Sequence, residues 1–133
     1  MKKGFQALLD EANAEIKAIS PQEAAEMAKS DDVTLVDIRD IRELNREGRI
    51  NGAIHAPRGM LEFWVDPESP YHRDVFASGN TFVFFCAAGW RSALATKSMQ
   101  EMGLEPVMHI EGGFAAWKEA ELPINEPDAA KKS

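Results

Sequence analysis

The chain has 133 residues, of which 44% are hydrophobic, and a formal net charge of −7 from 22 acidic and 15 basic side chains. This length fits one domain with a core of its own, and a single cysteine excludes an internal disulfide and the cysteine pairs of a structural zinc site. The negative charge disfavours nucleic acid and membrane surfaces as partners, and no run approaches the ~18 apolar residues of a membrane span.

The N-terminal segment is predicted to be an amphipathic helix over residues 4–17. Its apolar side chains, which begin with Phe5, Leu8 and Leu9, recur at helical spacing and suit packing on the domain or on a partner. Acidic residues at 10, 11 and 15 deprive this stretch of the apolar core of a secretory signal. We therefore expect a cytoplasmic protein.

The rest of the chain is predicted to alternate between strands and helices. The run "TFVFFC" is the strongest strand signal, because it is apolar on both faces, as a central strand of a parallel sheet is. Residues 58–80 are predicted to form a long loop with helical pieces, held down by Phe63, Trp64 and Phe76. This alternation predicts an α/β domain with a mainly parallel sheet. Strands are predicted over 33–38, 53–57, 81–86 and 106–110, and helices over 21–29 and within 39–48, 90–103 and 112–124.

Cys86 ends the predicted central strand, at the sheet edge where open α/β folds build their sites. Free N–H groups at the start of the next helix would stabilise a thiolate if the intervening loop curls around the sulfur. Gly89 suits such a loop because it tolerates a positive φ, and Arg91 adds a permanent positive charge. The alternative is that Cys86 is a packing residue, as most free cysteines are.

Four motifs resemble those of the rhodanese (sulfurtransferase) family and occur in its order. The segment "CAAGWRS" is similar to the family's active-site loop, and "LVDIRD", "GRINGAIHAP" and "IEGGFAAW" are similar to three of its other motifs. The resemblance extends over about residues 18–124. It divides the chain into an N-terminal helix over 1–17, a rhodanese domain over 18–125 and a polar tail over 126–133, which is predicted to be disordered.

The resemblance implies a rhodanese-like α/β fold, with a five-stranded, mainly parallel sheet flanked by helices on both faces. It also implies a sulfurtransferase in which Cys86 is the catalytic nucleophile. Cys86 would take a sulfane sulfur from thiosulfate or a persulfide, hold it as a persulfide, and pass it to cyanide or a thiol. No cofactor is implied, and a protein is a further candidate donor or acceptor. The loop whose amides would cradle the persulfide consists of Ala87, Ala88, Gly89, Trp90 and Arg91.

Two loop positions depart from the family pattern. Some family members carry basic side chains beside the cysteine to hold thiosulfate, where this chain has Ala87 and Ala88. Thiosulfate is therefore expected to bind weakly, and a bulkier or less charged donor is favoured. Arg58 would supply the missing charge from a neighbouring loop, or it is simply an exposed arginine, and the sequence leaves both interpretations open.

Charged residues after the first predicted strand are expected to support the site. Asp37 is predicted to position Arg91 or the loop backbone, within an ion-pair network that includes Arg39, and capping of the next helix is the alternative. Asp40 and Glu43 are interpreted as solvated charges at the start of that helix.

The three histidines, His55, His72 and His109, are scattered along the chain, so no metal site is expected. His55 and His109 are interpreted as structural residues rather than general bases. His72 belongs to the long loop, and the sequence does not show whether it approaches the cysteine.

Two other functions compete with sulfur transfer. The first is a phosphatase or arsenate reductase on the same fold, but those relatives place five residues between cysteine and arginine, whereas four separate Cys86 from Arg91. The shorter loop leaves room for one extra sulfur and fits a phosphate poorly. The second is a module that delivers sulfur to a partner protein, which the N-terminal helix would dock.

Overall fold

The sheet has five strands within residues 1–127, the part of the chain that this computed structural model describes. Its order is β1-β5-β4-β2-β3, and every neighbouring pair is parallel. The predicted α/β class is therefore confirmed, and β4 is the central strand as expected. The strands are β1 (Ala18–Ile19), β2 (Val33–Asp37), β3 (Ile54–His55), β4 (Thr81–Phe85) and β5 (Val107–Ile110).

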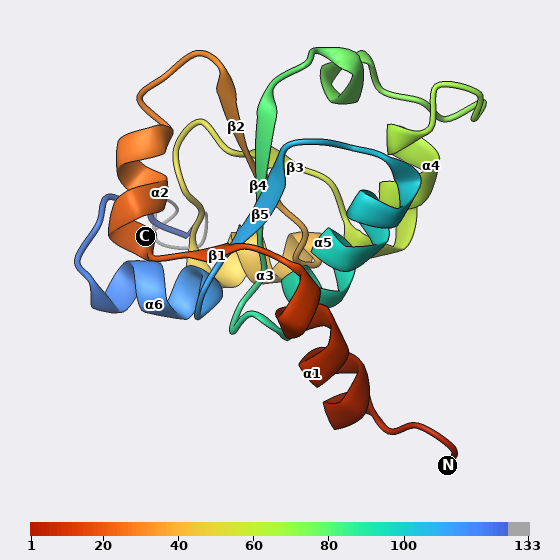
Figure 1. Ribbon diagram of the computed structural model, residues 1–133. Coiled ribbons are helices and arrows are strands. Elements are labelled where there is room, and N and C mark those ends of the chain that lie inside the picture. The colour runs from red at the N-terminus through yellow and green to blue at the C-terminus, as the bar shows by residue number, and fades with distance from the viewer. Residues whose placement is uncertain (128–133) are drawn as a thin grey trace.

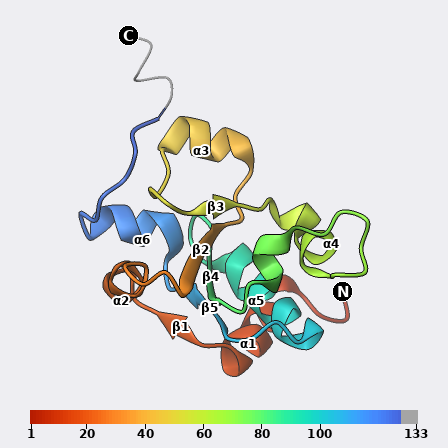
Figure 2. The ribbon, with the colours of Figure 1, turned by 90° about the horizontal axis from the view of Figure 1, so that it is seen from above.

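Helices cover both faces of this sheet. Figure 2 shows α2 and α6 on one side of the strands and α4 and α5 on the other. The α-helices are α1 (Phe5–Glu15), α2 (Pro21–Met27), α3 (Ile41–Glu47), α4 (Leu61–Val65), α5 (Trp90–Met102) and α6 (Gly113–Glu119), and the 3-10 helices are η1 (Arg58–Met60) and η2 (Asp74–Ala77).

The central strand is apolar on both faces because each face packs against a helical layer. Phe84 belongs to a cluster that includes Met99 of α5, whereas Phe85 belongs to one that includes Trp117 of α6. All four side chains are buried. This double burial explains why the sequence reads as an uninterrupted apolar run, and it holds the end of β4 firmly in place.

Helix α1 packs on α5 rather than on the sheet (Figure 1). Leu9 and Ala12 are buried against Ala93, while Phe5 and Leu8 remain exposed. One face of the predicted amphipathic helix therefore docks on the domain. Strand β1, which follows this helix, was not predicted from the sequence, because its two residues are too few to show a periodicity.

The long segment 58–80 contains the short helices η1, α4 and η2, as predicted. The Arg73 guanidinium carbon lies 4.0 Å from the ring centroid of Trp64, and Phe76 is buried. Trp64 and Phe76 therefore anchor the segment. Phe63 is 53% exposed, so its predicted anchoring role is wrong. The part before β4 lies across the molecule from the loop that joins β4 to α5 (Figure 1). Within residues 1–127, His72 lies near Asp74, 3.8 Å from its carboxylate, and makes no hydrogen bond to Cys86.

The C-terminal part of the described chain returns to the domain, because Arg49 and Asn125 form an antiparallel bridge. Of the predicted tail over 126–133, residues 128–133 lie outside the described part of the chain. None of the helices within residues 1–127 is long and apolar enough to cross a membrane.

Candidate active site

Cys86 lies directly after β4, where the chain curls around its sulfur. The backbone N–H groups of Gly89 and Ser92 donate to Sγ at 3.1 and 3.4 Å. The thiol is 1% exposed, and its Sγ lies 3.5 Å from the Ser92 hydroxyl. Converging N–H donors stabilise negative charge on sulfur, so the arrangement can hold a thiolate or another sulfur anion. One of the two donors, Ser92, lies beyond the predicted loop range of 87–91.

A left-handed backbone at Gly89 produces this turn. Its φ is 104°, and it precedes the first residue of α5. A side chain there would also approach the backbone nitrogen of Gly112 at 3.4 Å. The close passage of the two segments, together with the positive φ, favours glycine at this position.

The amino end of α6 fixes the other side of the loop. The N–H groups of Phe114 and Ala115 donate to the carbonyl oxygens of Cys86 and Ala87 at 2.8 and 3.0 Å. These carbonyls therefore point toward α6. A Cβ on Gly113 would clash with the Cys86 carbonyl oxygen and lie 2.8 Å from that of Ala87. The second glycine of "IEGGFAAW" is thus required for α6 to approach the cysteine.

His109 connects to the cysteine through Ser92. Its Nδ1 lies 2.9 Å from the Ser92 hydroxyl, and both residues are buried. Burial lowers the pKa of His109 below its ordinary value, which favours a neutral ring, whereas the Glu111 carboxylate acts in the opposite direction. His109 is hydrogen-bonded as a structural histidine would be, and Ser92 also links it to Sγ. Ser92 belongs to the motif "CAAGWRS", but no role was predicted for it, because its only signal is its place after Arg91 at the helix start.

Arg91 is held by Glu43 of α3, not by Asp37. Its Nη1 and Nη2 donate to the two Glu43 oxygens at 2.7 and 3.0 Å. Glu43 also accepts from the Asp40 backbone N–H, with which it forms the capping box of α3. The interpretation of Glu43 as a solvated charge is therefore wrong, because its side chain is only 20% exposed.

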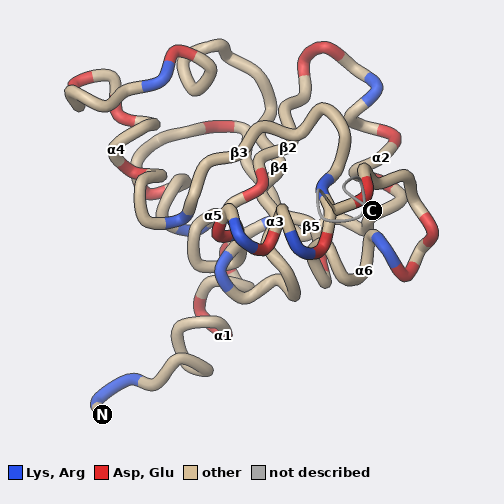
Figure 3. Tube along the Cα trace, turned by 180° about the vertical axis from the view of Figure 1, so that it is seen from behind, with Lys and Arg blue, Asp and Glu red and all other residues tan. Residues whose placement is uncertain are grey.

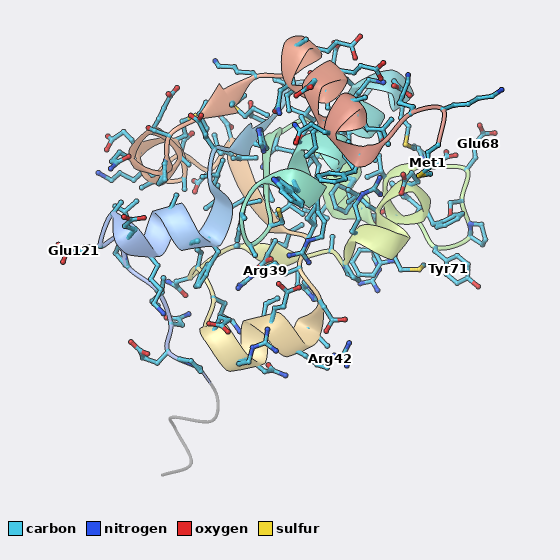
Figure 4. All side chains as sticks on the ribbon, turned by 90° about the horizontal axis from the view of Figure 1, so that it is seen from below. Met1, Arg39, Arg42, Glu68, Tyr71 and Glu121 are labelled. Carbon is cyan, nitrogen blue, oxygen red and sulfur yellow. The ribbon has the colours of Figure 1, made fainter. Side chains whose placement is uncertain are left out.

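Asp37 binds Arg39 instead, in a pair that is buried beneath the site. The Nε and Nη2 atoms of Arg39 donate to the carboxylate at distances from 2.8 to 3.2 Å. The guanidinium also donates to the Gly48 carbonyl and lies 4.1 Å from the ring centroid of Phe114. Asp37 does not position Arg91 as predicted, but the expected ion pair with Arg39 is present. Figure 4 shows Arg39 centrally between α3 and the loop, far from Tyr71.

Of the remaining predicted residues, Trp90 lies at the loop, whereas Arg58 and His55 are bound to other parts of the chain. Trp90 lies at the loop, 60% exposed, with its ring centroid 5.1 Å from that of Phe5 on α1. Arg58 forms a salt bridge with Glu62 at 2.8 Å, one helical turn further on, and within residues 1–127 its side chain makes no hydrogen bond to the loop. His55 donates from Nε2 to the Arg39 carbonyl oxygen, 2.7 Å away, which fits its structural interpretation. Within residues 1–127 no cluster of three or more His, Cys, Asp or Glu side chains could hold a metal ion.

The Arg91–Glu43 pair predicts a specific dependence of stability on acid. The hydrogen bond from Arg91 is the largest cause that lowers the pKa of Glu43 below its ordinary value of 4.5. Because the pKa of Glu43 is lower in the folded than in the unfolded protein, its ionised carboxylate adds to the free energy of unfolding above pH 4.5. This contribution is lost as the pH falls through the folded-state pKa. Urea unfolding of the Arg91→Gln variant between neutral pH and pH ~3 should show a smaller loss of stability on acidification than the wild type.

The matched control for that experiment is Arg58→Gln, which removes a guanidinium paired with a carboxylate away from the loop. It should retain the acid dependence of the wild type. An Arg91→Gln variant that lost stability on acidification as steeply as the wild type would contradict the assignment.

Comparison with known protein families gives a match over most of the chain. The family described as Rhodanese-like domain matches residues 20–120. Thiosulfate sulfurtransferase GlpE of Glaesserella parasuis is 35% identical over 106 residues, which is 80% of this chain and 90% of that protein. An uncharacterized Synechocystis protein is 33% identical over 105 residues, or 79% of this chain, but the chain spans only 54% of its length.

Two solved structures are similar over nearly the whole chain. A Rhodopseudomonas palustris protein of unknown function, described as a possible tyrosine phosphatase, is 52% identical with a TM-score of 0.91, covering 94% of this chain and 96% of that one. The polysulfide-sulfur transferase homodimer of Wolinella succinogenes is 32% identical with a TM-score of 0.71, covering 93% and 88%.

Proposed function

The chain belongs to the rhodanese-like domain family, and on that premise we propose that it transfers sulfane sulfur by way of a persulfide on Cys86. The observation that carries this proposal is the pair of N–H groups, from Gly89 and Ser92, that converge on Sγ. Curated relatives named sulfurtransferase support the same class of reaction.

The proposed reaction has two displacement steps at sulfur. The Cys86 thiolate attacks the outer sulfur of the donor, an Sγ–S bond forms, and the bond to the leaving group breaks. Sulfite or a thiolate departs with the electron pair. Cyanide or a thiolate then attacks the outer sulfur of the persulfide, and the Sγ–S bond breaks to return the Cys86 thiolate. The loop amides stabilise the anion at both stages.

The charges of the site favour a donor less highly charged than thiosulfate. Ala87 and Ala88 offer no cation, and the Arg91 guanidinium is already neutralised by Glu43. Arg58 is likewise paired, with Glu62. A thiosulfate dianion would therefore meet no free cation among the predicted site residues, whereas a persulfide carries at most one charge on its sulfur. We assign persulfides as the preferred donors and the cytoplasm as the location, since a lone free thiol stays reduced there.

A phosphatase is the second candidate, because the R. palustris relative is described as a possible tyrosine phosphatase. Two features of this chain oppose that activity. Only four residues separate Cys86 from Arg91, and the guanidinium that would have to grip the phosphate is bound to Glu43 at two points. Delivery of sulfur to a partner protein would use the same Cys86 chemistry.

Intact-mass measurement with a panel of sulfur donors tests the proposal. Incubation with a small-molecule persulfide should make the protein heavier by one sulfur atom, with lower occupancy from thiosulfate at the same concentration. Cyanide should remove the added mass and release thiocyanate. A protein that takes no sulfur from any donor, yet hydrolyses phenyl phosphate through Cys86, would replace this function with the phosphatase.

A further inference from the structure

The active-site loop borders a cavity that α1 helps to form. Its volume is about 390 Å³, within the usual size range of small-molecule sites. Gln6 and Asn13 line it from α1, Ala88 and Trp90 from the loop, and Glu111 from the turn after β5. Since the family match begins at residue 20, one wall of this cavity comes from outside the matched region.

Packing holds α1 in the position that forms this wall. Leu9 and Ala12 are buried against Ala93 of α5, and the ring of Phe5 contacts that of Trp90. Figure 4, which views the molecule from below, shows α1 beside the loop, on the opposite side from α3. Without α1 this side of the loop would be open to solvent.

The cavity is close to the reacting sulfur. Gly89 lines the cavity, and its N–H group is the donor that lies 3.1 Å from Sγ. His109 also lines it and reaches the cysteine through the Ser92 hydroxyl. Cys86 itself does not line the cavity, so a small molecule bound there would be separated from Sγ by the Gly89 backbone.

The lining of the cavity has a negative character. Glu111 is the one charged side chain among its described lining residues, and within residues 1–127 it makes no ion pair. Nearby arginines do not offset it, because Arg91 is paired with Glu43 and Arg39 with Asp37. The exposed face of Trp90 adds a second preference for cations, since an aromatic ring attracts positive charge.

We propose that this cavity binds the carrier part of the thiol that exchanges sulfur with Cys86, and that this carrier bears an ammonium group. The ligand class is a small aminothiol or its persulfide, with its ammonium between the Glu111 carboxylate and the Trp90 ring. The inference rests on the proposed sulfur transfer and specifies its substrate. In the acceptor direction the aminothiolate attacks the outer sulfur, a new S–S bond forms, Sγ leaves with the electron pair, and the ammonium is unchanged.

A smaller hollow on the other side of the loop has the opposite character. Its volume is about 250 Å³, and Lys118, Arg39 and Arg46 line it together with Glu43 and Glu47. Arg39 is paired with Asp37 and Arg46 with Glu47, so the positive character comes from Lys118, which forms no ion pair within residues 1–127. Figure 3 shows the acidic and basic positions that are interspersed along α3, which contributes three of these residues. This hollow would favour an anionic carrier, so the two sides of the loop predict opposite charge preferences.

The charge preference can be measured with three acceptor thiols of similar size: cysteamine, which is cationic, β-mercaptoethanol, which is neutral, and mercaptoacetate, which is anionic. The persulfidated protein is mixed with each thiol, and loss of the added sulfur is followed by intact mass. For each variant, the sulfur-loss rate with each thiol is divided by the rate with β-mercaptoethanol, which corrects for overall changes in the protein. This ratio is then compared with the wild-type ratio, which corrects for differences in the intrinsic reactivity of the thiols.

Glu111→Gln should lower the relative rate with cysteamine about fivefold and raise that with mercaptoacetate, with β-mercaptoethanol little changed. Trp90→Leu, at an exposed position, should lower the cysteamine rate in the same direction. The matched control is Glu119→Gln, which removes an equal charge from an exposed position on α6 that does not line the cavity.

Equal relative rates in wild type and Glu111→Gln would overturn the inference while leaving the sulfur-transfer function intact. A wild-type preference for mercaptoacetate that Glu111→Gln does not alter would assign the carrier to the hollow beside Lys118 instead. Failure of Cys86 to accept sulfur from any donor would overturn the proposed function itself, and the inference with it.

Discussion

Replacing Cys86 with serine should lower the rate of sulfur transfer from a persulfide or thiosulfate to cyanide by at least about a thousandfold. Serine keeps the size of the side chain and can accept hydrogen bonds from the Gly89 and Ser92 amides. A hydroxyl is nevertheless far less nucleophilic than a thiolate at neutral pH. Thiocyanate production under steady-state conditions measures this rate, and the variant should gain no mass on incubation with a donor.

The control for this variant is its stability. Cys86 is buried next to β4, so a loss of activity must be separated from a loss of fold. Urea unfolding of Cys86→Ser should remain cooperative, with a midpoint close to that of the wild type. Ser92→Ala is a second variant for comparison, because it changes a buried side chain next to Sγ but keeps the nucleophile. If the folded Cys86→Ser protein still formed thiocyanate at a tenth of the wild-type rate, Cys86 would not be the sulfur carrier.

Replacing Gly113 with alanine should destabilise the protein by about 3 kcal/mol or displace the loop, and either result should strongly reduce sulfur transfer. Its φ is +60°, and an added Cβ would meet the carbonyl oxygens of Cys86 and Ala87. These oxygens accept the hydrogen bonds by which α6 holds the loop. Unfolding in urea gives the free energy, and thiocyanate production by the folded fraction gives the effect on the site.

The matched control is Gly79→Ala, which separates backbone strain from the clash. Gly79 also has a positive φ, +83°, but an added Cβ there would meet nothing within 4 Å. It should lose only about 1 kcal/mol, the usual penalty of a left-handed conformation, and keep full activity. Equal effects of the two substitutions would mean that α6 does not fix the loop.

The sequence predicted the parts of the fold and site that local patterns determine. Residues 82–86 form an uninterrupted apolar run, and the segment 90–102 is a helix bounded by glycines. The position of Cys86 between a central strand and a helix could therefore be predicted directly. The closing helix, α6, was predicted from the Gly-Gly turn before it and the proline after it. The short strand β1 was missed because two residues carry no periodic signal.

The ion pairs of the site could not be predicted in the same way. Glu43 lies 48 residues before Arg91, and its position in the first turn of α3 fully accounts for a glutamate there as a capping residue. Only the packing of α3 beside the loop shows its second role. Asp37 was predicted as the partner of Arg91 because it stands at the end of a strand, but Arg39 donates to both of its carboxylate oxygens.

Ser92 and His109 illustrate the same limit. Each is an ordinary residue in its own element, and the 2.9 Å contact between them joins positions 17 residues apart on α5 and β5. A parallel sheet places such residues side by side only after the intervening helix has crossed over. The cavity wall on α1 is a further case, since nothing in residues 5–15 points to the loop that they border.

The hydrogen bonds from α6 to the loop determine when, during synthesis, a new chain can complete the backbone arrangement around Cys86. The amides that hold the Cys86 and Ala87 carbonyls belong to Phe114 and Ala115, which a ribosome adds long after the cysteine. Long-range contacts of this kind form late, once the segments on both sides are available. A nascent or truncated chain that ends before α6 would therefore carry the cysteine without these hydrogen bonds, and the loop around Sγ would be complete only after α6 has been made.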